Sequence, residues 1–193
     1  MSNTLKFSAI YALPVVAALL VTAIYAHAAG SKGPYVCKSV YALCSAAKCI
    51  PDPSNPGHAI CFCKTFKGPN VSPIPCDRAG KKTGKRGVVN LVSTFSIENS
   101  RQGKMSMICP KGTPWTNCFG APCTVDPTDP SKAICICPIV DSKVRWLTFG
   151  GDCDTDNCET GYWSGADVDD SNGYVSLLAA KAGVDTSVVK MCP

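Results

Sequence analysis

The residues of this chain that could do chemistry are its 14 cysteines, and their spacing occurs twice. The first copy of the pattern runs from Cys44 to Cys63 and the second from Cys118 to Cys137. Both copies read Cys-x4-Cys-x11-Cys-x-Cys, and an offset of 74 residues superimposes them. The motifs Asp-Pro-x-x-Pro and Ala-Ile-Cys-x-Cys recur at matching places. We interpret this stretch as a duplicated cysteine module.

Two kinds of chemistry fit such cysteines. Thiolates in Cys-x-Cys pairs could bind copper or zinc, because both metals accept sulfur ligands. Structural disulfides are the alternative, and we favour them because the chain has no Cys-x-x-Cys and no histidine cluster. We therefore expect no cofactor and an oxidised framework that uses all the cysteines: Cys37, Cys44, Cys49, Cys61, Cys63, Cys76, Cys109, Cys118, Cys123, Cys135, Cys137, Cys153, Cys158 and Cys192.

An export signal is predicted over residues 1–28. Lys6 precedes an apolar run at residues 10–24, and Ala26-His27-Ala28 is a small-x-small site, so we predict cleavage after Ala28. The alternative is an uncleaved anchor, since residues 8–29 are almost long enough to span a bilayer. In either case the rest of the chain is expected outside the cytoplasm, secreted or periplasmic, where disulfides persist.

The elements that must position the cysteines are short strands. Residues 29–108 form the first predicted module, with a basic loop and a hairpin, and residues 109–193 form the second. We predict a β-hairpin over 49–63, because proline and glycine crowd its middle and Cys61 and Cys63 then share one face. Clustered apolar residues predict a further hairpin between 88–97 and 105–109, and a strand at 144–149.

A helix is predicted at residues 174–182, ended by Gly183, because Val175, Leu178, Ala179 and Ala182 fall on one face. Cys158 and Cys192 remain outside the six-cysteine modules, so we expect them to bond each other and hold this helix. The predicted fold class is small, disulfide-rich and mainly β. It consists of two duplicated six-cysteine modules built on β-hairpins plus a short C-terminal α-helix.

Six cysteines with a Cys-x-Cys between the fourth and fifth resemble the spacing of EGF-like modules, over about half of the mature chain. The calcium-binding Asp-x-Asp/Asn-Glu of that family is missing before Cys37 and Cys109. The resemblance implies bonds from first to third, second to fourth and fifth to sixth cysteine. These would be Cys37–Cys49, Cys44–Cys61, Cys63–Cys76, Cys109–Cys123, Cys118–Cys135 and Cys137–Cys153.

Charge is divided unevenly along the chain. Residues 31–105 contain 12 lysines and arginines against 3 acidic residues, and residues 106–193 contain 6 against 11. The basic and acidic parts could complement each other within one chain or between two self-associating molecules. Nucleic acid is not an expected partner outside the cell. The basic loop at 77–87 could instead contact an anion, such as anionic lipid, through Arg78, Lys81, Lys82, Lys85 and Arg86.

Asp152, Asp154 and Asp156 are calcium candidates, because they have the i, i+2, i+4 spacing that begins a calcium loop. The EF-hand pattern then needs Gly at the sixth position and Glu at the twelfth, where this chain has Asn157 and Trp163. A solvated acidic face is therefore the favoured interpretation.

Catalysis is not predicted. His58 is the one histidine beyond the signal, and we place it in the hairpin turn, so a Ser-His-Asp or Cys-His arrangement has no suitable base. Aromatic residues such as Trp115 and Trp146 are expected to be packing anchors rather than sugar-stacking platforms.

The expected function is that of an exported binding or structural protein of the cell envelope or extracellular space. Its partner would be a protein or an envelope surface, with a membrane as partner only if the signal segment is uncleaved. The turns at 52–57 and 126–131 would present the contact residues. One alternative is an extracytoplasmic metal-binding or redox protein that uses the Cys-x-Cys pairs, and another is a secreted protease inhibitor.

Overall fold

Strands dominate the computed structural model, which describes residues 33–141 and 143–193 and so confirms the predicted mainly β class. The predicted signal over 1–28 lies outside the described residues. The strands are β1 Tyr35–Leu43, β2 Cys49–Pro51, β3 His58–Ser72, β4 Lys82–Thr83, β5 Val89–Val92, β6 Met107–Cys109, β7 Pro114–Thr116, β8 Pro122–Val125, β9 Lys132–Asp141, β10 Trp146–Thr148 and β11 Ala166–Asp167. The helices are α1 Cys76–Ala79, α2 Glu98–Arg101 and α3 Val168–Ala182, with 3-10 turns η1 Lys85–Gly87, η2 Gly151–Cys153 and η3 Thr155–Glu159.

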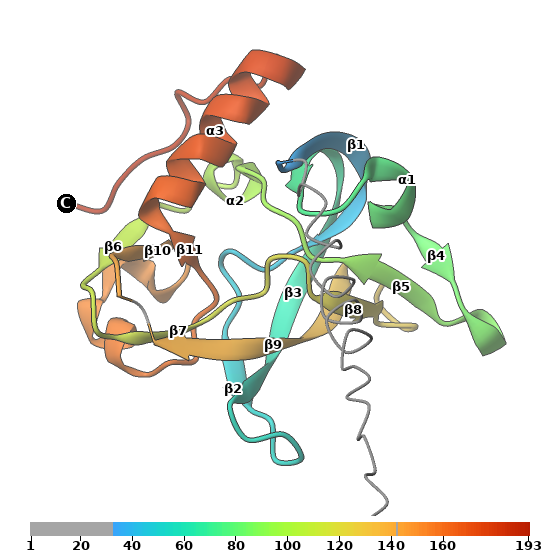
Figure 1. The fold of residues 1–193 in the computed structure, drawn as a ribbon, viewed down its shortest axis with the longest axis horizontal. Helices are drawn as coiled ribbons and strands as arrows, with labels where there is room; N and C mark the ends of the chain where they lie inside the picture. The colour runs from blue at the N-terminus through green and yellow to red at the C-terminus, as the bar shows by residue number, and fades with distance from the viewer. Residues whose placement is uncertain (1–32, 142) are drawn as a thin grey trace, which may run out of the picture. The chain divides into compact units, whose positions relative to one another are not determined.

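Eight of these strands belong to one sheet. Six follow each other in the order β1-β3-β9-β8-β5-β4, while β2 also pairs with β3 and β7 with β9. A second sheet has the order β11-β10-β6. Both cysteine modules therefore supply neighbouring strands to the larger sheet, with β3 from the first beside β9 from the second (Figure 1).

The pairing of β3 with β9 is approximately twofold symmetric. These strands are the equivalent segments of the two copies, and they run antiparallel with Cys61 opposite Cys135. Ala59 lies opposite Cys137, and a shift by the repeat offset turns this pair into Cys63 opposite Ala133, which is also observed. The duplication in the sequence therefore becomes a local symmetry of the sheet.

The sheet curls until β1 meets the chain beyond β5. Ala42 and Ser93 form an isolated parallel bridge, and the Thr94 N–H donates to the Ala42 carbonyl at 3.0 Å. The side chains inside this curl are small, because four disulfides take up the space between the strands. The buried residues of this core are Ala42, Cys44, Ala47, Cys49, Ala59, Cys61, Cys63, Leu91, Cys118, Ala121, Cys123, Ala133, Cys135 and Cys137.

Two further clusters hold the remaining elements. Leu178 of α3 is fully buried among Val71, Phe95, Leu147 and neighbouring apolar residues. Trp115 and Trp146 are buried and stacked with ring centroids 5.9 Å apart, which confirms that they are packing anchors. No helix in the described ranges combines the length and apolar character needed to cross a bilayer.

The predicted hairpin at 49–63 is confirmed as β2 and β3, and the predicted strand at 144–149 contains β10. The second predicted hairpin is wrong: β5 pairs with β4 and β8, and β6 pairs with β10. The reason is that residues 98–101 form α2 instead of a tight turn. The predicted C-terminal helix is confirmed, but it begins at Val168, because the Asp167 carboxylate accepts a hydrogen bond from the Asp169 N–H at 2.8 Å.

All 14 cysteines are disulfide-bonded, as expected, but the pairing implied by the resemblance is wrong, and so is Cys158–Cys192. Cys49 and Cys61 are directly opposite in the hairpin and bond each other, as do Cys123 and Cys135 in the second copy. The seven bonds indicate an oxidising, extracytoplasmic environment. They are Cys37–Cys76, Cys44–Cys63, Cys49–Cys61, Cys109–Cys158, Cys118–Cys137, Cys123–Cys135 and Cys153–Cys192.

Candidate ligand-binding pocket

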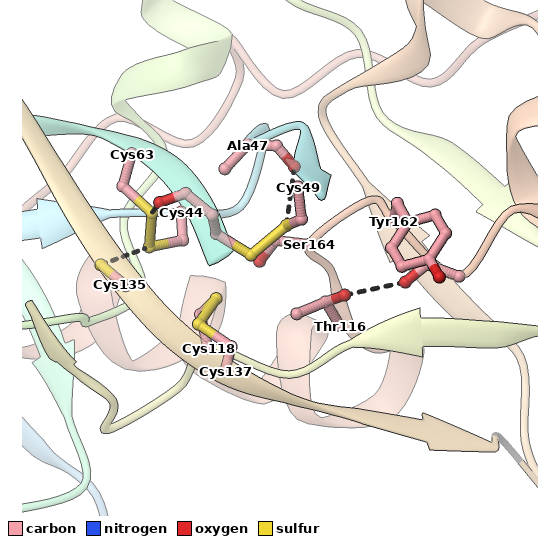
Figure 2. Close-up of a disulfide and its surroundings, with 12 residues drawn as sticks. Cys44, Ala47, Cys49, Cys63, Thr116, Cys118, Cys135, Cys137, Tyr162 and Ser164 are labelled. Atoms are coloured by element: carbon pink, nitrogen blue, oxygen red, sulfur yellow. Dashed lines mark hydrogen bonds between the residues drawn. A yellow bond between two sulfur atoms is a disulfide. The ribbon is translucent and has the colours of Figure 1, made fainter. Parts of the chain in front are cut away.

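The disulfides of the curled sheet form a closely packed sulfur core. The Cys44 Sγ lies 3.4 Å from the Cys135 Sγ, although each sulfur is bonded to a different partner (Figure 2). Two groups of three sulfurs lie within 4.8 Å of one another, Cys44, Cys63 and Cys135 in one and Cys61, Cys118 and Cys137 in the other. All six are buried and oxidised, whereas metal binding requires thiolates. In this state the cluster acts as rigid packing.

A pocket of about 520 Å³ opens beside this core, between the ends of several strands. That volume lies within the range of sites for small molecules, which often occur at the mouths of curled β-sheets. Its walls are predominantly apolar. The lining residues are Val40, Thr65, Lys81, Gly87, Val88, Val89, Leu91, Thr124, Val125, Asp126, Pro127 and Pro130. We call this space the mouth pocket.

The local sequence explains why these side chains face the pocket. Alternate residues of a strand point to the same side of a sheet, so Val125 follows Cys123 and Thr65 follows Cys63 on the inner side. Leu91 lies opposite Cys123 in the β5–β8 pair and is buried in the same core. The floor of the mouth pocket is therefore held by strands that disulfides cross-link.

The two charged groups of the pocket lining differ in their partners. Asp126 Oδ1 accepts hydrogen bonds from the Thr128 hydroxyl at 2.7 Å, the Thr128 N–H at 2.8 Å and the Asp129 N–H at 3.2 Å. These bonds, the Thr128 hydroxyl above all, hold the pKa of the Asp126 carboxyl below its usual value. Lys81 forms no ion pair with any residue that the structure describes. The pocket thus offers an apolar space bordered by one cation and by one carboxylate that is held within its own turn.

The predicted anion-binding loop is only partly assembled at this pocket. Lys81 lines it, whereas Arg78 lies in α1, Lys82 in β4 and Lys85 in η1. The side chain of Arg86 lies outside the described residues. Of the two predicted contact turns, the one at 126–131 borders the pocket through Asp126, Pro127 and Pro130.

The three aspartates that are calcium candidates do not converge on one point in the described part of the chain. Asp152 has a side chain that is 95% exposed and lies 3.7 Å from Lys104 Nζ, while Asp154 Oδ1 accepts the Asp156 N–H at 3.1 Å. Within the described ranges, these three carboxylates are not among the groups of three potential ligands that lie within 4.8 Å of one another.

The sequence predicts His58 in the hairpin turn. In the structure it is instead the half-buried first residue of β3. Its Nδ1 is buried and has no hydrogen-bond partner among the described residues.

The sequence does not indicate that most of the lining residues share one pocket. Val88, Val89 and Leu91 were recognised as part of a strand, but nothing in their spacing indicates that they face Val40 and Val125. The pairing of β5 with β8 brings these segments together, and it joins residues thirty or more positions apart. Comparison with protein-family models, with curated proteins and with solved structures found no match for this chain.

Proposed function

We propose that this protein is an exported, disulfide-stabilised binding protein that holds a small amphipathic anion in the mouth pocket. It would act without catalysis, in the periplasm or in the extracellular space. The observation that carries the proposal is an apolar pocket of about 520 Å³ whose lining includes one cation, Lys81, which forms no ion pair in the described part of the chain.

Three features support this ligand class. The apolar lining favours a hydrocarbon or aromatic body, which loses contact with water on binding. Lys81 is the one cation among the described lining residues, and the Asp126 Oδ1 is held by hydrogen bonds within its own turn. The neighbouring basic loop adds positive potential that attracts anions toward the opening.

The proposal is tested with two fluorescent probes that share a ring skeleton, anionic 1-anilinonaphthalene-8-sulfonate and neutral N-phenyl-1-naphthylamine. We expect both to bind the purified protein. The variant V88T keeps the size of a lining side chain but makes it polar, and V88W fills part of the space. Because Val88 is 43% exposed, both variants should fold. V88W should abolish binding of both probes.

Charge is tested separately with K81A and the control K82A. K81A should weaken binding of the anionic probe about three-fold at low salt, the range expected for a screened ion pair. Binding of the neutral probe should stay unchanged. K82A removes a neighbouring cation that does not line the pocket. Unchanged probe binding by V88W would contradict the proposed pocket, and equal effects of K81A on both probes would contradict the anionic ligand class.

A further inference from the structure

The outer face of the β3–β9 pair carries apolar side chains that no other described element covers. Cys61, Cys63 and their counterparts point into the core, so the alternate residues point outward. Four large apolar side chains on this face are about half exposed: Ile50 at 46%, Phe62 at 51%, Ile134 at 46% and Ile136 at 50%. We call this set the outer face.

These side chains form one continuous patch. Phe62 lies directly opposite Ile134, and Ile60 lies between Ile136 on one side and Ile50 on the other. The outer face therefore holds half of the eight large apolar residues that are exposed in the described ranges. Single exposed apolar residues are ordinary, but a contiguous patch marks a surface that interacts with something apolar.

A second hollow deepens one end of the patch. It measures about 530 Å³, is predominantly apolar and is lined in part by Phe62, Phe66, Gln102 and Ile134. Phe62 and Ile134 thus belong both to the patch and to the hollow. An apolar group that reaches this surface could enter between them.

Lysines surround the same end of the outer face. Lys64 and Lys132 lie directly opposite each other in the β3–β9 pair, next to Phe62 and Ile134. Lys48 immediately precedes β2, two residues before Ile50, and its carbonyl accepts the Phe62 N–H at 3.1 Å. Like charges that face each other across a sheet are unfavourable, so a nearby anion would stabilise this arrangement.

The titratable groups around these lysines offset only part of their charge. Lys132 Nζ lies 2.8 Å from Asp129 Oδ2, which raises the pKa of Lys132. Lys64 Nζ donates to the neutral Gln102 side chain at 3.3 Å. Asp126 also borders the hollow and adds a second negative charge. The outer face therefore combines exposed apolar side chains with a net positive charge, because three lysines lie near two carboxylates.

We propose that the outer face docks onto an anionic lipid bilayer. Phe62, Ile134 and Ile136 enter the boundary between headgroups and acyl chains, while Lys48 and Lys64 contact lipid phosphates. Charge complementarity selects this occupant over a second copy of the chain, because a second outer face would bring the same lysines toward one another. Thr65 and Asp126 border both the hollow and the mouth pocket, but the inference rests on the outer face and does not depend on a ligand in the mouth pocket.

The test is co-sedimentation of the purified protein with lipid vesicles. We expect binding to vesicles that contain equal amounts of phosphatidylcholine and phosphatidylglycerol, and little binding to phosphatidylcholine alone. Added salt should weaken binding. K64Q should reduce the partition coefficient about five-fold, the effect expected for one lysine near an anionic surface, and F62S about ten-fold.

The variant V88W serves as the matched control, because it changes an exposed apolar residue at the mouth pocket. V88W should bind vesicles normally while losing the fluorescent probes, and F62S should show the reverse. The failure of one proposal is thereby distinguishable from the failure of the other. Equal binding to both vesicle types, or unchanged binding by F62S, would overturn the inference. Concentration-dependent dimerisation that F62S abolishes would identify a second copy as the occupant, and would overturn it too.

Discussion

Single carboxylates fix the turns between the paired strands. In the first hairpin, Asp52 Oδ1 accepts the Ser54 N–H at 2.9 Å and the Ser54 hydroxyl at 2.7 Å. Asp126 makes the equivalent bonds to Thr128 in the second copy. The Asp-Pro-x-x-Pro motif therefore recurs because its aspartate replaces backbone hydrogen bonds that the turn lacks. The second of these turns forms one wall of the mouth pocket.

Acid should remove part of the stability that the turn at 126–131 contributes, over a defined pH range. The hydrogen bond and ion pair with Lys132, together with donors from Ser131, lower the pKa of Asp129 to about 2. A carboxyl with a lowered folded pKa contributes stability above its unfolded pKa, and loses that contribution as pH falls toward the folded value. We expect the loss between about pH 4 and pH 2.

The matched variant for this prediction is D129N, which keeps a side-chain oxygen as acceptor but does not titrate in that range. Urea unfolding midpoints measured from pH 7 downward should converge for the wild type and D129N at the acid end. A constant difference between the two proteins at every pH would contradict the assigned role of the carboxylate.

At the scale of elements, α3 is held by its packed side chains, among them Leu178 and Tyr174, more than by its own propensity. Leu178 is fully buried, whereas Gly173 lies within the helix with no atom near the position of a Cβ. Gly183 ends the helix in the left-handed conformation, with φ of +61°, which glycine adopts without strain. The helix thus has a well-defined C-terminal end, and the buried Leu178 contributes to its attachment.

Two substitutions in α3 should have opposite effects. L178A should lower the free energy of unfolding by about 2–5 kcal/mol, because it leaves a cavity in the core. G173A should raise it by about 0.5–1 kcal/mol, because alanine loses less backbone freedom in a helix. Chemical denaturation of both variants checks these signs. A stabilising L178A would show that the helix does not pack as described.

At the scale of the molecule, the two cysteine modules share one sheet and one sulfur core. β3 of the first copy pairs along β9 of the second, and Leu91 from the first packs among Cys118, Cys123 and Cys135 from the second. Neither copy buries its inner face without the other. The local symmetry therefore places an extended strand pairing, from His58 opposite Pro138 to Lys64 opposite Lys132, at the junction of the copies.

We expect residues 34–193 to unfold in a single cooperative transition with the disulfides intact. All 3 tryptophans lie in the second module, residues 109–193, so their fluorescence reports on that half. Amide hydrogen exchange of β1 and of the β1-paired end of β3 reports on the first half. The two measurements should give the same midpoint in denaturant. Separate midpoints would mean that the copies are independently stable units.

The sequence by itself determined the features that depend on local pattern. The duplication, the use of every cysteine in a disulfide, the hairpin over 49–63 and the end of the helix at Gly183 all follow from neighbouring residues. The start of that helix was also available in principle, since Asp167 is a normal capping residue.

Only the tertiary structure decided which cysteines bond and where a pocket opens. Cys109 reaches Cys158 across 49 residues, and Val40 meets Leu91 and Val125 because the sheet curls. Cysteine spacing leaves many pairings open, so the choice depends on strand register. Register and closure depend on contacts between distant segments, which a one-dimensional pattern does not contain.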